Sequence, residues 1–241
     1  MKRLCLILTL TAMVATPAFS QQSAPEIPFE SLPRPLKYSP DMNLGEILGI
    51  AVNSVGHIVI LNHPGSANQG PIWSNSTTQL LEFDQDGYYV GEIGKGVYGI
   101  AYAHQVRFDD EDNLWVVDKA ANTVIKFDPD GYVSMNLGRR EEGYHGDVEL
   151  PNQREARAVG GYFNGPTDVA WDPDGNIFVS DGYGNSRIHK YTANGEHLMS
   201  WGEPGIDAGQ FIRPHNIAVD EQERVYVADR ERHRVQVFDA D

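Results

Sequence analysis

The sequence has almost no cysteine, because Cys5 is the only one among 241 residues. It lies in an N-terminal segment where a short basic stretch and an apolar run precede a small-x-small cleavage site at residues 18–20. This pattern is typical of a secretory signal peptide, so we expect residues 1–20 to be removed. The mature chain would then be periplasmic or secreted, with no disulfide and no thiol chemistry.

Long apolar runs and an excess of positive charge are also missing. No segment approaches the roughly 18 uninterrupted apolar residues of a membrane-spanning helix, so we expect no membrane insertion. Nineteen Lys and Arg residues face 34 Asp and Glu residues, which gives a formal net charge of −15. Such a charge repels phosphate backbones, so nucleic acid is excluded as an expected partner.

An internal repeat dominates the rest of the chain. Each copy is an apolar strand, a polar turn and a second strand rich in β-branched and aromatic residues. The four copies are Ile50–Leu61, Val106–Asp118, Val169–Asp181 and Ile217–Asp229. A period of about 45–50 residues with four strands per unit is typical of a β-propeller.

The predicted fold class is therefore all-β, a propeller of four-stranded antiparallel blades. Third strands are expected at Asn122–Asp128, Ser186–Thr192 and Arg232–Asp239, and glycine turns at Gly131 and Gly195 lead into fourth strands. A Pro-rich lead-in covers residues 21–44 and the propeller covers 45–241. Its blades span approximately 45–98, 99–161, 162–210 and 211–241, the last one partial. We expect a surface insertion at residues 138–161 and an incomplete ring.

Candidate functional residues follow from the repeat geometry. The entry to the first strand and the end of the second strand lie at the same end of a hairpin, so both should line one mouth of the ring. The first position holds His104, Thr167 and His215, and the second holds His63, Lys119, Gly182 and Arg230, with Tyr183 one step further. Imidazoles suit zinc, a phenol beside a metal ion can act as a base, and a guanidinium can clamp a carboxylate.

Structural roles explain the same residues equally simply. His104 and His215 could form hydrogen bonds at strand starts, and Tyr183 could be a packed loop aromatic. Arg230 could pair with a neighbouring carboxylate on the surface. Two histidines also fall short of a catalytic zinc site, which takes three protein ligands.

Several short runs resemble one known family. Residues 178–188 read FVSDGYGNSRI, residues 214–215 read PH, and residues 228–230 read ADR. Together they are similar to the peptidyl-α-hydroxyglycine α-amidating lyases, which are six-bladed propellers of the NHL-repeat type. The similarity covers roughly residues 45–241 and is densest between Pro166 and Asp239.

The resemblance implies a chemistry and a set of site residues. The family cleaves a peptidyl-α-hydroxyglycine to a peptide amide and glyoxylate with zinc held by three histidines, two of which match His104 and His215. It implies a catalytic role for Tyr183 and Arg230, and a structural calcium ion bound by the main-chain carbonyls of Ile50 and Val106. The third histidine and a calcium-binding Asp belong to a last blade that the sequence does not contain. A second active-site arginine of the family falls at His63, to which we assign part of the substrate-orienting role.

Three hypotheses result. The first is a zinc-dependent, amidating-lyase-like enzyme that acts on a small peptide-like substrate, of which we expect this sequence to be an incomplete part that is inactive alone. The alternative is a non-catalytic NHL-repeat module that binds a peptide or protein at the same mouth, since propellers have many functions. The third is a calcium-dependent lactonase-type propeller, which needs acidic and amide ligands where this chain has histidines, Thr167 and Tyr183.

Overall fold

The computed structural model describes residues 26–64, 77–140 and 162–240. Contacts divide the chain into residues 1–33 and residues 34–241. The described part of the first unit contains no strand or helix, and the expected signal peptide and residues 141–161 of the expected insertion lie outside the described residues. No helix in the described ranges is long and apolar enough to cross a membrane.

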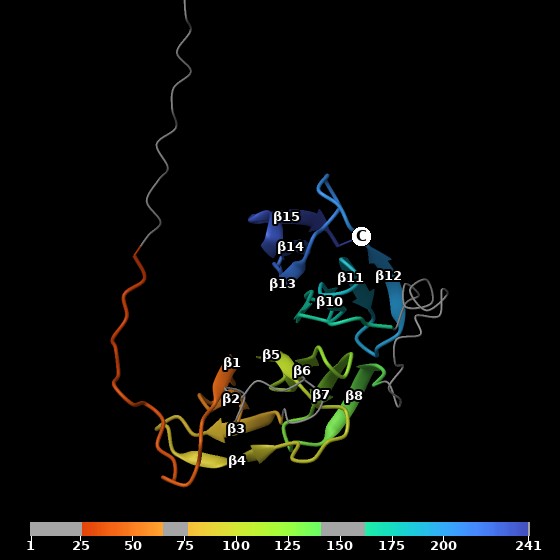
Figure 1. Ribbon diagram of the computed structural model, residues 1–241. Helices are drawn as coiled ribbons and strands as arrows, with labels where there is room; N and C mark the ends of the chain where they lie inside the picture. The colour runs from red at the N-terminus through yellow and green to blue at the C-terminus, as the bar shows by residue number, and fades with distance from the viewer. Residues whose placement is uncertain (1–25, 65–76, 141–161, 241) are drawn as a thin grey trace, which may run out of the picture. The chain divides into compact units, whose positions relative to one another are not determined.

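The second unit consists of four antiparallel sheets in chain order (Figure 1). Within each sheet, every strand pairs with the next one along the chain, and three sheets have four strands while the last has three. The first two sheets contain β1 (Glu46–Val52), β2 (Ile58–His63), β3 (Gln79–Phe83), β4 (Tyr89–Ile93), β5 (Ala103–Phe108), β6 (Leu114–Asp118), β7 (Thr123–Phe127) and β8 (Val133–Gly138). The last two contain β9 (Asp168–Trp171), β10 (Ile177–Asp181), β11 (Arg187–Tyr191), β12 (His197–Trp201), β13 (Pro214–Val219), β14 (Arg224–Asp229) and β15 (Arg234–Asp239).

The sheets pack as the blades of a propeller, which confirms the predicted fold class. The first strands of successive sheets lie next to one another, β1 against β5, β5 against β9 and β9 against β13. A hydrophobic core fills each space between neighbouring sheets. Trp115 and Val124 of the second sheet pack with Val169 and Val179 of the third, for example. A blade has two apolar faces, so it becomes stable only between its neighbours.

The second strand of each blade lies deepest. All five residues of β6 and of β10 are buried, which explains why their sequences show no polar alternation. Burial of each large aliphatic or aromatic side chain there contributes about 1.5–3 kcal/mol to the free energy of unfolding. The predicted glycine turns are also present, because Gly131 and Gly195 both have φ 84°.

The last predicted third strand begins later than expected. Arg230–Arg232 form a short 3₁₀ turn and His233 has φ 51°, so extended structure resumes only at Arg234. Part of the lead-in also belongs to the first blade. Lys37 donates a backbone hydrogen bond to Gly87 and accepts one from Tyr89, which adds a short parallel bridge beside β4.

Candidate functional site

A buried acceptor at the end of each second strand fixes one rim of the propeller. Asp229 Oδ1 accepts hydrogen bonds from the amides of Ile212 and Arg213, at 3.1 and 2.9 Å, and Asp118 Oδ2 accepts one from Ala101 at 2.6 Å. These amides belong to the loops that enter the first strands of the same blades. The repeated Asp therefore ties the two chain positions that we expected to share a rim.

The two predicted zinc histidines are bulged residues. In β5, Ala103 pairs with Asp118 and Gln105 pairs with Val117, which leaves His104 as the extra residue between them. His215 lies in the same way between Pro214 and Asn216 in β13. We expected these histidines just before the strands, whereas they lie within them. A bulge turns its extra side chain out of the regular alternation, and bulges are frequent beside active sites.

Three predicted site residues meet at this rim. The Tyr183 hydroxyl lies 3.2 Å from His104 Nε2 and 3.4 Å from His215 Nε2. The two imidazole centroids are 4.8 Å apart. His104 lies in β5 of the second blade and His215 in β13 of the fourth, and Tyr183 lies in the loop after β10 of the third blade. The propeller thus brings together side chains that are distant along the chain.

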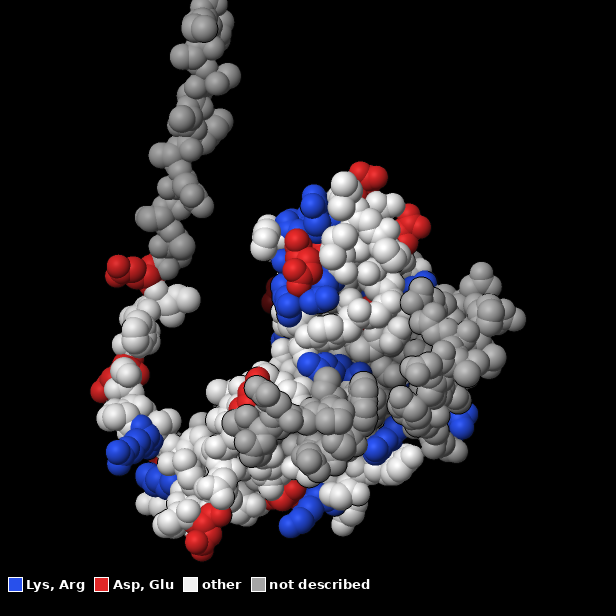
Figure 2. Space-filling view, in the orientation of Figure 1, with Lys and Arg blue, Asp and Glu red and all other residues white. Residues whose placement is uncertain are grey.

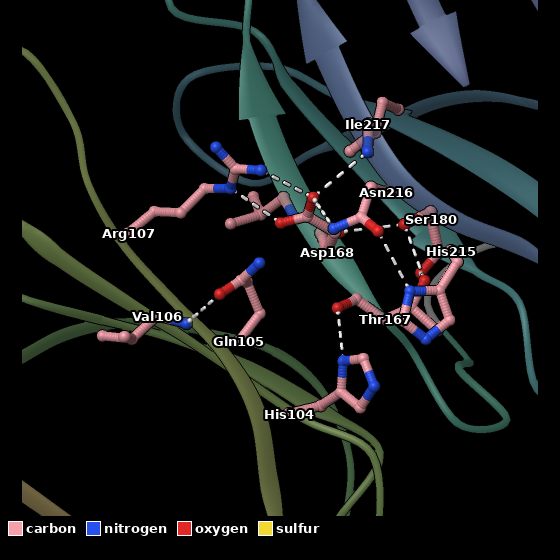
Figure 3. A network of polar contacts seen from close by, with 11 residues as sticks. His104, Gln105, Val106, Arg107, Thr167, Asp168, Ser180, His215, Asn216 and Ile217 are labelled. Atoms are coloured by element: carbon pink, nitrogen blue, oxygen red, sulfur yellow. Dashed lines mark hydrogen bonds and ion pairs between the residues drawn. The ribbon is translucent and has the colours of Figure 1, made fainter. Parts of the chain in front are cut away.

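The other nitrogen of each imidazole is anchored (Figure 3). His104 Nδ1 donates to the Thr167 carbonyl at 2.9 Å, and His215 Nδ1 donates to Asn216 Oδ1 at 3.0 Å. With Nδ1 protonated, each neutral ring carries its lone pair on Nε2. Burial lowers the pKa of His104 to about 4 and also lowers the pKa of His215, so both rings are neutral near pH 7.

A buried carboxylate supports both anchors. Arg107 donates two hydrogen bonds of 2.7 Å to Asp168, one to each oxygen, and the Asp168 side chain is fully buried. Asp168 Oδ2 also accepts from the amide of Ile217 at 3.1 Å and from Asn216 Nδ2 at 3.3 Å. Asn216 in turn holds His215, and Asp168 directly follows Thr167, which holds His104. Figure 3 shows this network, which links residues of three blades, beside the imidazoles.

Two positively charged side chains lie close to the Tyr183 ring. Lys119 Nζ lies 5.0 Å from its centroid, and the guanidinium carbon of Arg213 lies 5.1 Å away. Burial lowers the pKa of Lys119, while Glu46 and Asp118 act in the opposite direction. Arg230, predicted to steer an anion, follows β14 and pairs with Glu231 at 3.0 Å. Cations therefore gather near the phenol although the chain is acidic.

Two backbone contacts require glycine around Tyr183. Gly165 has φ 77°, and a Cβ atom there would lie 2.6 Å from Tyr183 Cβ. The Tyr183 amide donates to the Gly165 carbonyl at 3.2 Å. A Cβ atom at Gly182 would lie 1.8 Å from the Pro214 carbonyl oxygen, immediately before His215. These close approaches set the position of the phenol against the third and fourth blades.

His63 occupies a different environment from the one expected. Its side chain is fully buried, and its ring lies 4.0 Å from the ring of Tyr102. Burial lowers the pKa of His63 and raises the pKa of Tyr102 to about 12, where a hydrogen bond to Glu46 adds to the effect. Tyr102 stacks under Lys119 at 4.7 Å. A substrate-orienting role for His63 stays a prediction. His63 could act only indirectly, through its contact with Tyr102 and the contact of Tyr102 with Lys119.

The expected calcium carbonyls belong to neighbouring first strands. Ile50 lies in β1 and Val106 in β5, and the strands approach closely where a Cβ atom on Gly49 would lie 3.3 Å from the Val106 amide nitrogen. Calcium binding there stays a prediction. Across residues 26–64, 77–140 and 162–240, no group of three His, Cys, Asp or Glu side chains converges on a common metal position. Zinc binding by His104 and His215 stays a prediction as well.

Sequence reasoning missed several residues of the rim. Asp168, Arg107 and Asn216 lie within ordinary strand sequence, and Arg213 and Glu231 lie in loops. Three of them adjoin predicted rim residues and could have pointed to the rim: Arg213 is two residues before His215, Asn216 follows His215, and Glu231 is a neighbouring carboxylate of Arg230.

Comparison with known proteins gives these features a family context. Residues 163–191 and 211–238 match the NHL repeat family. The chain is 31% identical over 221 residues to a probable peptidyl-α-hydroxyglycine α-amidating lyase of Caenorhabditis elegans, with 84% of this chain and 58% of the relative covered. It is 32% identical over 225 residues to peptidyl-α-hydroxyglycine α-amidating lyase 1 of Drosophila melanogaster, with 82% and 38% covered. The chain therefore spans between about two fifths and three fifths of the length of these two relatives.

Solved structures agree with the fold. A streptogramin B lyase structure has a TM-score of 0.55 at 13% identity, over 83% of this chain and 56% of that one. A catalytically inactive variant of virginiamycin B lyase from Staphylococcus aureus, with quinupristin, has a TM-score of 0.53 at 14% identity, over 83% and 57%. At such identities the likeness concerns the fold. The repeat match and the sequence relatives support the resemblance: the chain is a propeller with NHL repeats and is similar to the peptidyl-α-hydroxyglycine α-amidating lyases.

Proposed function

We propose that this chain provides the reaction site of a zinc-dependent peptidyl-α-hydroxyglycine amidating lyase. The observation that carries the proposal is the Tyr183 hydroxyl, which lies within 3.4 Å of Nε2 of both His104 and His215. The named relatives support the reaction class. The predicted signal peptide supports a periplasmic or secreted location, and the ligand would be a small peptide-like substrate.

The two imidazoles fit zinc as part of its ligand set. Both are neutral, both point Nε2 at the same place, and both have Nδ1 held by an oxygen acceptor, an arrangement typical of metal-binding histidines. A bound zinc ion would act as a Lewis acid toward the hydroxyl and carboxylate oxygens of the substrate. Asp168 and Asn216 would keep the rings in place during the reaction.

The side chains of this chain would then carry the proton transfer. The substrate has an amide nitrogen bonded to a carbon that bears a hydroxyl and a carboxylate. Tyr183, as the base, takes the hydroxyl proton, a carbon–oxygen double bond forms, and the carbon–nitrogen bond breaks. The leaving nitrogen takes a proton, so the products are a peptide amide and glyoxylate. Arg230 holds the carboxylate end so that the hydroxyl faces Tyr183.

Metal analysis and product detection test the proposal together. The complete protein should bind zinc and release glyoxylate from N-benzoyl-α-hydroxyglycine, since His104 and His215 are two of the three protein ligands that a catalytic zinc site takes. Tyr183→Phe should retain zinc and lose glyoxylate release, because it removes the proton acceptor and leaves both imidazoles. His197→Ala is the matched control, since His197 lies on the outer strand β12. Absence of zinc binding or of glyoxylate release would overturn the proposal in favour of a non-catalytic NHL-repeat module.

A further inference from the structure

Two arginine side chains hold the same carboxylate oxygen beside the candidate site. Arg213 Nη1 donates to Glu231 Oε1 at 2.9 Å. Arg230 donates to the same oxygen through Nε at 3.2 Å and pairs with it through Nη2 at 3.0 Å. Guanidinium groups that converge on a carboxylate are a frequent means of recognising carboxylate ligands. The rim thus contains a two-arginine carboxylate site with a carboxylate of the chain itself in it.

This site is built into the same rim as the imidazoles. The Arg230 amide donates to the Arg213 carbonyl at 3.0 Å, so the two backbones are joined directly. The Arg213 guanidinium lies over the Tyr183 ring at 5.1 Å.

The contacts of Glu231 can be exchanged for those of a ligand. The side chains of Arg213, Arg230 and Glu231 are 31%, 50% and 40% exposed. Ion pairs this exposed change an equilibrium by about fivefold or less. Exchange of Glu231 for a ligand carboxylate would therefore cost little free energy.

The charge distribution favours an anion at this place. The whole chain has a net charge of −15, yet two guanidiniums here face one carboxylate. Figure 2 shows Lys and Arg atoms gathered around a small acidic group on the part of the surface that carries β13–β15. Displacing Glu231 by a ligand carboxylate would leave the charge of the arginine pair compensated.

We propose that Arg213 and Arg230 together bind the carboxylate end of the substrate, and that Glu231 occupies this site until that carboxylate displaces it. The ligand class is a small N-acylated α-amino carboxylate. This deepens the function proposed above and rests on it for the identity of the substrate. The binding step itself needs neither zinc nor turnover.

Hippurate, which is N-benzoylglycine, is the probe. It has the amide and the carboxylate of the substrate class but no hydroxyl, so it binds without being cleaved. Calorimetric titration of the metal-free chain should show hippurate binding that weakens as salt rises. Glu231→Gln should strengthen it by up to about fivefold, because the internal competitor loses its charge. Glu221→Gln, in the turn between β13 and β14, is the control of equal charge and should change nothing.

Arginine variants complete the test. Arg213→Gln should weaken hippurate binding by about fivefold or more, and Arg213→Lys should fall between Gln and the parent chain, because it keeps the charge without the forked donors. Equal thermal midpoints would show that the variants are folded. Binding that does not change or weakens in Glu231→Gln would overturn the proposal. The proposal would also be overturned if binding of hippuramide, the neutral amide analogue, changed in the Arg213 and Glu231 variants as hippurate binding does.

The two proposals can fail separately. If the chain binds hippurate as described but the complete protein releases no glyoxylate, the arginine site stands and the lyase function is rejected. If glyoxylate is released while Arg213 and Glu231 variants bind hippurate like the parent chain, the lyase function stands and the internal competitor is rejected.

Discussion

His104 and His215 are bulged residues of two different blades, and their imidazole centroids lie 4.8 Å apart with an interplanar angle of 70°. The phenol oxygen of Tyr183 lies 3.2 Å from Nε2 of His104 and 3.4 Å from Nε2 of His215. Three consecutive blades thus contribute one side chain each. The following expectations depend on this arrangement.

Removal of either imidazole should abolish high-affinity zinc binding. His104→Ala and His215→Ala should each lower the zinc affinity by more than the roughly 10- to 100-fold that loss of an outer partner of a metal ligand costs. Equilibrium titration against a competing chelator measures this. If either variant binds zinc like the parent chain, that histidine is not a ligand.

Replacement of Asp168 should affect both stability and the metal site. Asp168→Asn leaves the Arg107 guanidinium and the Ile217 amide without their charged partner, which should cost about 3–5 kcal/mol of unfolding free energy. Zinc affinity should fall about 10- to 100-fold, because Asn216 and Thr167 lose their support.

A double variant separates these effects of Asp168. In Asp168→Asn combined with Arg107→Gln, the loss of stability should be smaller than the sum of the single losses, because the unpaired charge is gone. Denaturant unfolding measures the stability. Zinc affinity should stay low in the double variant. Additive losses would contradict a coupled ion pair.

Stability should depend on pH through His104. Its pKa is about 4 in the folded chain against 6.5 as the ordinary value, and burial is the main cause. Between these values the unfolded state binds more protons, so unfolding free energy should fall as the pH decreases from 6.5 towards 4. Denaturant midpoints of the metal-free chain measure this. The slope should be shallower in His104→Gln, and an identical slope would argue against the shift.

Gly165 should be required for the position of Tyr183. Gly165→Ala adds a methyl group 2.6 Å from Tyr183 Cβ at a φ of 77°, so the phenol must move away from the imidazoles. We expect glyoxylate release to fall while zinc affinity changes little. Gly96→Ala is a close control, because Gly96 has φ 76° with nothing within 4 Å of the added atom. Equal effects of the two variants would show that only backbone strain matters.

The sequence predicted the architecture and the rim because both depend on local rules. Strand alternation, turn glycines and a repeat period identify blades, and the ends of a hairpin must share one side. His104, Tyr183 and His215 could therefore be grouped before any coordinates were known. The bulges that hold the histidines could not be recognised from the sequence. One extra residue interrupts the strand pattern in the same way as the end of a strand does, so both histidines were predicted to lie before their strands.

Contacts between blades were beyond prediction from the sequence. The pairing of Arg107 with Asp168 depends on how neighbouring blades pack. The contacts of Arg213 and Arg230 with Glu231 lie within one blade and depend on side-chain rotamers. His63 illustrates the same limit, since its position on the rim was predictable while its burial against Tyr102 was not.

The sheet formed by β9–β12 acts as a spacer between the two imidazoles. His104 is on the blade before it and His215 on the blade after it, so the thickness of this one sheet sets the gap between the two nitrogen donors. A change of side-chain volume in the cores on its two faces, around Val179 or Phe178, would widen or narrow that gap without touching either histidine. For a metal ion held by these two imidazoles, the preferred ionic radius would then depend on buried residues that do not touch the ion.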